Sequence, residues 1–460
     1  MIPLESRLQR AAAALGNRYT VALVASAGLI EIALGSLLGL GRPASHVPTF
    51  LVYYWCAAVG YLVACWAVSK EPRTFVHARA LAWIWVAAIA FRLTALPLMP
   101  SLSEDAARYR WQGMVQDAGG DPYVSVPEDP RWERLRDSTW DRVSSKDKPS
   151  AYGPLVEQLN LWHYRLIAFS GASPQAQVWL FKLPFALADL LVGIALMGLL
   201  RAASKPRRWI LIYLWCPLPV VEFWAEGHND AVAVALVVWA LTFHLRRRPT
   251  PALALLAVAT MCKFWPIILL PFLAMRRGSS GWNVHWRGLV AATAVGATLC
   301  LPYWRSLPAV LGVLDGFAAG WRNNDSLFGV LLSLAGGDAR LAAAVGRVIV
   351  ICLVAGLVAV RPRGCKGELA AICVLLFLSA NCFPWYLSWM LPLAALYPSA
   401  PLLLWTALVP LAYHVVPAYE AVGLWEYDEG LLFLEYFPVL LWLAFSGGDA
   451  AHRLVPRRTP

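Results

Sequence analysis

The chain has 460 residues, of which 59% are hydrophobic and 15% are charged, and its net charge is +11. A soluble domain has about 45–50% apolar and about 25% charged residues, so this composition excludes a soluble protein. The basic residues form short clusters between long apolar runs, as in the cytoplasmic loops of membrane proteins, and we expect no nucleic-acid partner. The clusters are Lys205–Arg208, Arg246–Arg248, Arg276–Arg277, Arg361–Lys366 and Arg457–Arg458.

Uncharged runs close to the ~20 apolar residues that a helix needs to cross a membrane recur along the chain. They predict an all-α polytopic membrane protein with about 12 transmembrane helices in a single membrane domain. Residues 1–78 hold an N-terminal helix pair, residues 79–446 the main part and residues 447–460 a cytoplasmic tail. We place the helices near residues 19–40, 49–68, 79–98, 175–200, 208–224, 231–246, 286–303, 338–361, 367–381, 385–398, 400–416 and 430–446.

The apolar segment Pro251–Met275 is long enough to cross the membrane, but basic clusters flank it on both sides. It contains Lys263 and Pro266 near its centre. Two half-helices that enter and return on the cytoplasmic side satisfy the charge rule, so we predict one re-entrant helix pair here. A full crossing is the alternative, and it would place the cluster Arg276–Arg277 outside.

With this topology both termini are cytoplasmic. The outer face receives a long loop after the third helix, residues 99–174, and the shorter segments 226–230, 305–338 and 417–430. Most acidic and amide side chains lie in these segments. We therefore expect the chemistry on the outer face of the membrane.

The first candidate site is the acid pair Glu104-Asp105, directly after the third predicted helix. A carboxylate at the membrane interface is well placed to act as a general base on a lipid-borne substrate. Tyr109 lies four residues after Asp105, so on a helix the two side chains share a face. The structural alternative is that Ser103 and the acids only cap a short interfacial helix.

The second candidate is the run His228-Asn229-Asp230 at an outer turn. Its donors and acceptors suit sugar hydroxyls or a lipid phosphate. The alternative is that Asp230 only caps the next helix, after a turn at Gly227.

Lys263 is a cation within an apolar segment, where it costs about 2.5–3.5 kcal/mol and usually has a partner. A lipid phosphate is the partner that we expect, and snorkelling to the cytoplasmic interface is the alternative. Arg322, beside Asn323 in an outer loop, is a further phosphate ligand or else a solvated loop residue. Trp385 and Tyr386 either stack on a sugar or belong to the interfacial aromatic belt.

A series of motifs in this order resembles GT-C membrane glycosyltransferases similar to bacterial glycosyltransferase family 87, the polyprenol-phosphate-mannose type. The resemblance runs from about residue 80 to residue 446. In that superfamily an acid of the first large outer loop activates the acceptor hydroxyl. The resemblance assigns this role to Asp105, with Glu104 its neighbour. The motifs are Glu104-Asp105 with Arg108-Tyr109, Tyr152-Gly153-Pro154, Gly227–Asp230, Lys263–Pro266, Trp321–Phe328, Pro384–Tyr386 and Glu435–Pro438.

Three positions depart from the family pattern. Gln112 stands where the family usually has Asp, Gly153 where it has Pro, and Phe383 where it has His. The first and last changes remove a carboxylate and an imidazole.

The resemblance implies a GT-C-like core that transfers a hexose, expected to be mannose, from a polyprenyl-phosphate donor to a lipid or glycan acceptor. The transfer inverts the anomeric centre, and Lys263, Arg322 or His228 holds the leaving phosphate. Membrane lipids surround the site. No cofactor is expected, and the pair Glu104-Asp105 is only weak evidence for a divalent ion. A secondary transporter or lipid flippase, or a non-catalytic glycolipid-binding relative, are the alternatives.

Overall fold

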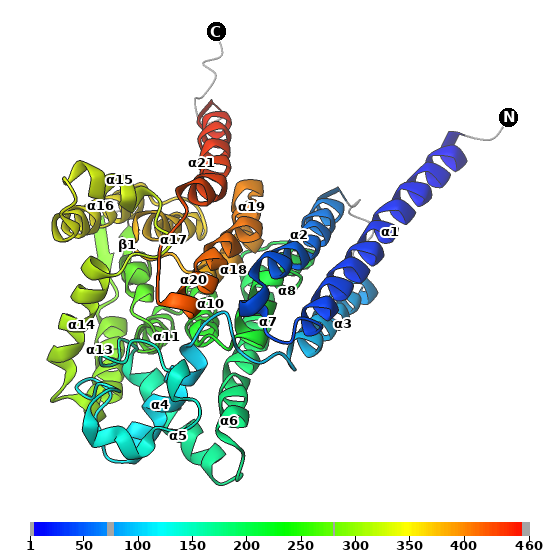
Figure 1. The fold of residues 1–460 in the computed structure, drawn as a ribbon. Helices are drawn as coiled ribbons and strands as arrows, with labels where there is room; N and C mark the ends of the chain where they lie inside the picture. Colours follow the sequence, from blue (N-terminus) through cyan, green and yellow to red (C-terminus); the bar gives the residue numbers. More distant parts are fainter. Residues whose placement is uncertain (1–3, 71–77, 279–280, 453–460) are drawn as a thin grey trace.

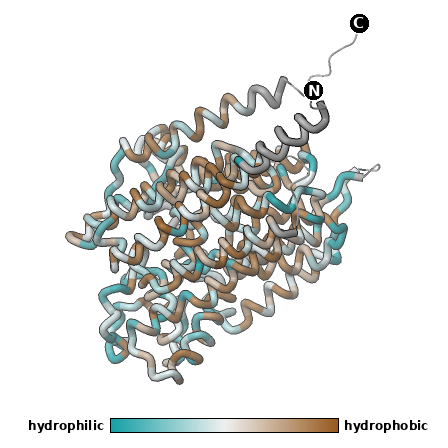
Figure 2. Tube along the Cα trace, turned by 90° about the vertical axis from the view of Figure 1, so that its right-hand side faces the viewer, coloured by the Kyte–Doolittle hydropathy of each residue, from teal (hydrophilic) through white to brown (hydrophobic). Residues whose placement is uncertain are grey.

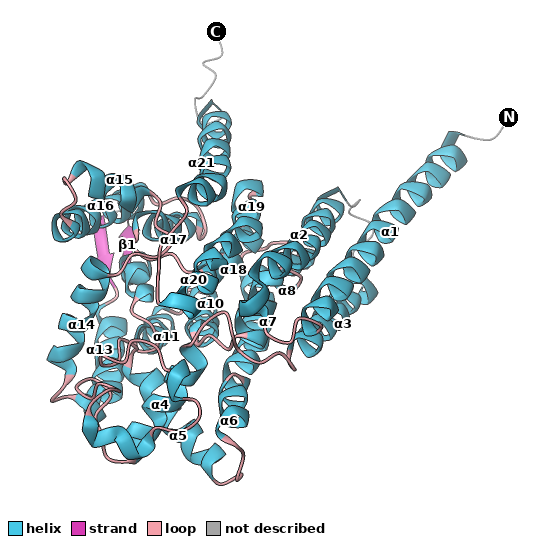
Figure 3. Ribbon diagram, in the orientation of Figure 1, coloured by secondary structure: helices cyan, strands magenta, loops and turns pink. Residues whose placement is uncertain are grey.

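The computed structural model describes residues 4–70, 78–278 and 281–452 (Figure 1). Within these ranges the chain is mainly helical, as predicted, with several 3-10 helices among the α-helices. The described strands are β1 (Met275–Gly278) and β2 (Gly281–Val284), which form one antiparallel hairpin (Figure 3). Of the predicted tail, residues 447–452 continue the last helix, whereas residues 453–460, with Arg457–Arg458, lie outside the described residues.

Most helices follow one another with short connections, but the long segment 118–153, with two short 3-10 helices, separates the fourth α-helix from the fifth. In chain order they are α1 (Leu4–Leu38), α2 (Val47–Lys70), α3 (Ala78–Ala95), α4 (Asp105–Asp117), α5 (Pro154–Ala168), α6 (Pro174–Phe181), α7 (Leu183–Ala202), α8 (Leu211–Leu214), α9 (Pro217–Pro219), α10 (Asp230–Leu245), α11 (Pro249–Thr260), α12 (Leu270–Ala274), α13 (Trp286–Cys300), α14 (Leu307–Gly320), α15 (Leu327–Leu334), α16 (Ala339–Val360), α17 (Lys366–Leu378), α18 (Leu391–Leu396), α19 (Ala400–Leu408), α20 (Val416–Val422) and α21 (Glu429–His452).

Six described helical segments are long and apolar enough to cross a membrane, or seven if the bent pair Trp286–Tyr303 and Pro308–Leu314 forms one span. The predicted count of 12 is therefore not confirmed. Proline divides several of the apolar runs: the predicted helix 208–224 is replaced by the short helices α8 and α9 and a π-helix at Val220–Ala225. The predicted helix 385–398 begins with a 3-10 helix and only then becomes α18. The six segments are Arg18–Leu38, Pro43–Lys70, Pro174–Ala202, Ala339–Val360, Ala400–Val422 and Glu429–Ser446.

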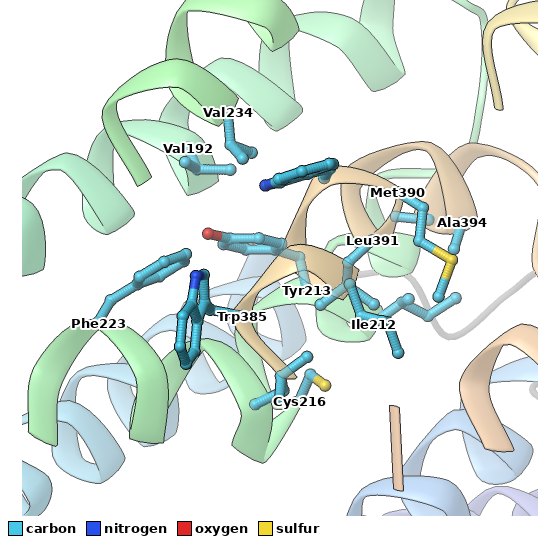
Figure 4. Close-up of a cluster of buried hydrophobic side chains, with 14 of the residues drawn as sticks. Val192, Ile212, Tyr213, Cys216, Phe223, Val234, Trp385, Met390, Leu391 and Ala394 are labelled. Carbon is cyan, nitrogen blue, oxygen red and sulfur yellow. The ribbon is translucent and has the colours of Figure 1, made fainter. Parts of the chain in front are cut away.

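The core surrounds α10, which packs between α7 and α11, and α11 packs in turn on α13. Apolar segments run through the body of the molecule, and the polar ones gather toward its edges (Figure 2). Figure 4 shows part of the core, where Trp385 and Phe223 lie beside Tyr213, Val192 and Val234. Helices α4 and α5 lie at the lower end of Figure 1, away from the start of α1 and the end of α21.

The helix break predicted around Lys263 and Pro266 is present between α11 and a 3-10 helix at Trp265–Leu269. Pro266 has no N–H to donate to the carbonyl of Cys262, four residues earlier. That carbonyl accepts instead from the N–H of Gly153, at 3.1 Å, and the carbonyl of Met261 accepts from the N–H of Leu155, at 2.9 Å. The start of α5 therefore satisfies the broken turn, as buried backbone groups require.

Candidate functional site

A cavity of about 930 Å³ opens beside the start of α4. Its wall combines the loop before α5, the helix break near Lys263, the 3-10 helix at Pro384–Trp389 and the segment around α20. Of the candidate residues, eight line the cavity: Glu104, Asp105, Arg108, Tyr152, Lys263, Asn323, Trp385 and Tyr386. Tyr109, His228, Asn229, Asp230 and Arg322 are not in its wall.

Asp105 is the first residue of α4. The Tyr109 hydroxyl donates a hydrogen bond to Asp105 Oδ2 over 2.8 Å, which confirms that the two side chains share a helix face. Glu104, the N-cap residue, makes no capping hydrogen bond through its side chain. Neither carboxylate of the pair therefore caps the helix, and both side chains face the cavity.

Glu226 holds the chain that leads into α4. Its Oε2 accepts hydrogen bonds from the backbone N–H groups of Ser101, Leu102 and Ser103, at 2.9, 2.9 and 3.2 Å. Glu226 is buried, so these charge-assisted bonds are protected from water. The carboxylate therefore fixes the position from which Asp105 projects into the cavity.

Glu104 lies beside Asp105 at the edge of the cavity. Burial raises the pKa of its carboxyl to about 7, although Lys146 and Arg142 act to lower it. The neighbouring charges of Asp105 and Glu420 add to the rise. Glu104 therefore changes its charge near neutral pH, next to the proposed base.

Lys263 forms an ion pair with Asp230, with Nζ 2.8 Å from Oδ2. Its ammonium group also lies 5.5 Å from the ring centre of Tyr152 and 5.4 Å from that of Tyr386. Trp389 Nε1 donates to the other carboxylate oxygen of Asp230, at 2.7 Å. The protein itself thus supplies a counter-charge for Lys263, so the lysine does not snorkel, and Asp230 does more than cap α10.

His228 lies behind the cavity wall and is fully buried. Its ring stacks on Trp385 with centres 3.7 Å apart, and its Nδ1 lies 3.1 Å from Glu222 Oε2. Burial alone lowers the pKa of His228, but the hydrogen bond and the charge of Glu222 outweigh it and raise the pKa. His228 Nε2 and the amide of Asn229 have no hydrogen-bond partner in the described part of the chain. The direct sugar contact predicted for these residues stays a prediction, because Trp385 stands between His228 and the cavity.

Backbone pairing with the segment 380–382 brings Asn323 to the cavity. Its N–H donates to the carbonyl of Ala380 at 2.9 Å, and its carbonyl accepts from the N–H of Cys382 at 2.8 Å. This pairing sets Asn323 beside the 3-10 helix that carries Trp385. Arg322 instead forms an ion pair with Asp325 at 2.9 Å, and its side chain is 49% exposed. The structure therefore places Arg322 outside the cavity that holds Asp105.

Arg108 organises the loop before α5. Its guanidinium donates to the backbone carbonyls of Ser144, Ser145 and Lys148 at 2.8, 2.9 and 2.6 Å. Gln112, with its amide oxygen turned toward Arg108, accepts two further bonds of 3.0 Å from the guanidinium. The guanidinium of Arg108 thus makes its hydrogen bonds largely within the protein.

Sequence reasoning missed two cations of that loop, Lys146 and Lys148, which line the cavity. It also missed Glu226. The signal for the lysines was a charged run in an outer loop, which is common in solvated loops. Glu226 stood in a segment expected to face outside, but nothing in the sequence connects it to the backbone before Asp105.

Aromatic side chains form much of the remaining wall. The rings of Tyr386 and Trp389 stack at 4.3 Å, and those of Phe383 and Trp385 at 4.5 Å. Trp385 is stacked by His228 as well as by Phe383, so both of its faces are covered, and the sugar stacking predicted for it and for Tyr386 stays a prediction. The aromatic residues that line the cavity are Tyr152, Phe264, Trp265, Trp321, Phe383, Trp385, Tyr386, Trp389, Tyr413, Tyr419 and Trp425.

The sequence profile of the alpha-(1→6)-mannopyranosyltransferase N-terminal domain matches residues 14–278, more than half of the chain. The chain belongs to this family. The matched range runs from α1 to β1 and contains Asp105, Asp230 and Lys263. This confirms the predicted relation to GT-C-type mannosyltransferases, whereas the narrower resemblance to glycosyltransferase family 87 stays a prediction.

GPI mannosyltransferase 1 of Eremothecium gossypii is 36% identical to the chain over 121 residues. The aligned part is 26% of this chain and 30% of that relative, so the chain spans less than a third of the relative's length. No solved structure matches the chain. In the described residues there is no group of three or more His, Cys, Asp or Glu side chains arranged to hold a metal ion.

Proposed function

We propose that the protein is a membrane mannosyltransferase that takes mannose from a polyprenyl-phosphate carrier and transfers it to a lipid or glycan acceptor on the outer face of the membrane. Membership of the mannopyranosyltransferase family supports the sugar and the reaction class. The position of Asp105 carries the proposal: it lies in the wall of a large cavity lined by aromatic rings, by four carboxylates and by the four cations Arg108, Lys146, Lys148 and Lys263.

In the proposed reaction Asp105 accepts the proton of an acceptor hydroxyl. The hydroxyl oxygen forms a bond to the anomeric carbon while the bond from that carbon to the phosphate oxygen breaks, and the electron pair leaves with the polyprenyl phosphate. A single displacement of this kind inverts the anomeric centre. The Tyr109 hydroxyl orients the carboxylate of Asp105 through its 2.8 Å hydrogen bond.

The leaving phosphate needs positive charge. Lys263 presents its ammonium group between the rings of Tyr152 and Tyr386, and Lys146 and Lys148 stand in the same wall. Because Asp230 neutralises much of the charge of Lys263, the loop lysines complete the phosphate site. Arg322 is not part of this phosphate site, since it pairs with Asp325 and lies outside the cavity.

The proposed topology keeps the re-entrant pair. Arg247, just before α11, and Arg276, just after α12, line one and the same cavity. A segment whose two ends meet at one place supports entry and return on one side of the membrane. The acid pair then faces outside, and both termini face the cytoplasm.

The test is transfer of labelled mannose from a synthetic polyprenyl-phosphate mannose by the purified protein. Asp105→Asn should lower turnover by about 10²–10⁴-fold, because general-base assistance is worth that much. Glu104→Gln is the matched control in the same turn and should be much milder. We also expect activity to survive EDTA. Full activity of Asp105→Asn would remove Asp105 as the base, and no transfer by the parent protein from any polyprenyl-phosphate sugar would remove the proposed donor class.

A further inference from the structure

A second cavity, of about 320 Å³, is lined mainly by basic side chains. Its described lining contains no Asp or Glu. The basic residues come from four separate parts of the chain: the end of α10, strand β1, the turn before α13 and the residue after α16. The full lining is His244, Leu245, Arg247, Pro249, Arg276, Arg277, His285 and Arg361.

The cavity is separate from the proposed transfer site. Asp230, the partner of Lys263, begins α10, and His244 lies in its last turn. At a rise of 1.5 Å per residue the helix separates the two by roughly 20 Å. The proposed transfer reaction uses none of the basic residues of the second cavity.

Arg361 is held at this cavity in a strained backbone conformation. It adopts a left-handed backbone conformation with φ of 51°, which is unusual for a residue with a side chain. Its Nη2 donates to the carbonyl of Met275 at 2.7 Å, which ties it to the hairpin. Its Nη1 is buried and has no hydrogen-bond partner among the described residues. The guanidinium therefore keeps a free donor for a ligand.

The protein supplies too little negative charge to balance this cluster. The carboxyl ends of α10 and α16 contribute about half an elementary charge each. The buried Glu368 on α17 adds one carboxyl near Arg361. Against these stand the four guanidinium groups of Arg247, Arg276, Arg277 and Arg361. An excess of positive charge remains, and an anion with several acceptor oxygens would satisfy it.

The surroundings of the cavity suit a membrane interface. Trp282 on β2 and Trp286 at the start of α13 are 42% and 63% exposed, and tryptophan gathers at the level of lipid headgroups. We propose that this cavity binds a phosphate group, as carried by the headgroup of an anionic membrane lipid; its place at the cytoplasmic surface rests on the topology proposed above. Planar guanidinium groups bind phosphate oxygens in pairs, which fits a cavity with four of them.

The test measures binding of phosphatidylglycerol to the full-length protein by native mass spectrometry, with phosphatidylcholine as the neutral reference. Arg276→Gln/Arg277→Gln should weaken phosphatidylglycerol binding by at least roughly tenfold, since hydrogen bonds to charged groups are lost. Arg246→Gln/Arg248→Gln is the control, because it removes the same charge from neighbouring exposed residues that do not line the cavity.

Equal losses in the two double variants would overturn the proposal, since they would show only unspecific attraction. Thermal unfolding of each variant in detergent separates a lost site from a lost fold, and Arg361→Gln offers a second variant if the hairpin is disturbed. A further arm adds inorganic phosphate. If inorganic phosphate competes with phosphatidylglycerol, and Arg276→Gln/Arg277→Gln abolishes that competition, the cavity is a phosphate site but its ligand is a soluble one. No binding of either probe would overturn the site itself.

Discussion

The ion pair of Lys263 and Asp230 makes a sharp prediction about stability. From the sequence alone, Lys263→Met should leave the protein folded, because methionine removes an unpaired cation from an apolar segment. The structure reverses that expectation. Asp230 is fully buried, and Lys263 is its counter-charge at 2.8 Å. Lys263→Met therefore leaves a buried carboxylate without its cation.

Removing one member of a buried pair typically costs about 3–5 kcal/mol. The cost should fall near the lower end here, because Trp389 still donates to Asp230 and the amino end of α10 still faces it. Asp230→Asn alone should also destabilise the protein, since it strands the cation of Lys263. The double variant Lys263→Met/Asp230→Asn removes both charges and should recover most of the loss, with a coupling of about 2 kcal/mol.

The assay is unfolding of the four proteins in one detergent, followed by tryptophan fluorescence. We expect the double variant to unfold at a higher denaturant concentration than Lys263→Met. Donor binding, measured separately, shows whether Lys263 also contacts the phosphate. Strictly additive losses would refute the reasoning, because they would mean that the two charges do not stabilise each other.

Three further predictions concern the approach to Asp105 and the topology. Glu226→Gln should lower kcat by about 10–100-fold with little change in the KM for the donor, because it loosens the backbone that positions the base. Steady-state kinetics check this, and an unchanged kcat would contradict it. Because the raised pKa of Glu104 is about 7, its carboxyl is neutral below that pH and negative above it. The KM for the anionic donor should therefore rise from about pH 6 to about pH 8, and Glu104→Gln should flatten that part of the profile. Cysteines at positions 248 and 277, in a background without other exposed cysteines, should both be shielded from an impermeant reagent added outside, and labelling at 277 alone would exclude re-entry.

The sequence predicts the helical class, the membrane location and the position of the helix break, because these follow from long apolar runs, basic clusters and Pro266. It does not predict the number of spans. Hydropathy measures how apolar a run is, but it does not show where proline and local hydrogen bonds turn the chain. The segment from 208 to 224 is as apolar as a span, and its prolines nevertheless divide it into α8, α9 and a π-helix.

In the candidate site, too, some contacts could be predicted from the sequence and others could not. Asp105 and Tyr109 were predictable as a pair, since their spacing of four is a local property of a helix. The partner of Lys263 was not, because Asp230 lies 33 residues earlier and the contact depends on how α10 packs on α11. The three bonds from the backbone to Glu226 likewise join segments more than 120 residues apart. Long-range pairings of this kind have no signature in a single sequence.

The departures from the family pattern become intelligible from the contacts they make. Gln112 has an amide where the family has a carboxylate, but its oxygen still accepts hydrogen bonds from Arg108. Gly153 donates its N–H to Cys262, which a proline could not do, and a Cβ there would lie 2.1 Å from the carbonyl oxygen of Met261. Phe383 stacks on Trp385 in the cavity wall. Two of the three changes therefore preserve the scaffold around Asp105, and only the third, Phe383, lines the cavity. On this argument only Phe383 bears on which sugar or acceptor the proposed site binds, and the other two departures leave the proposed base and its support in place.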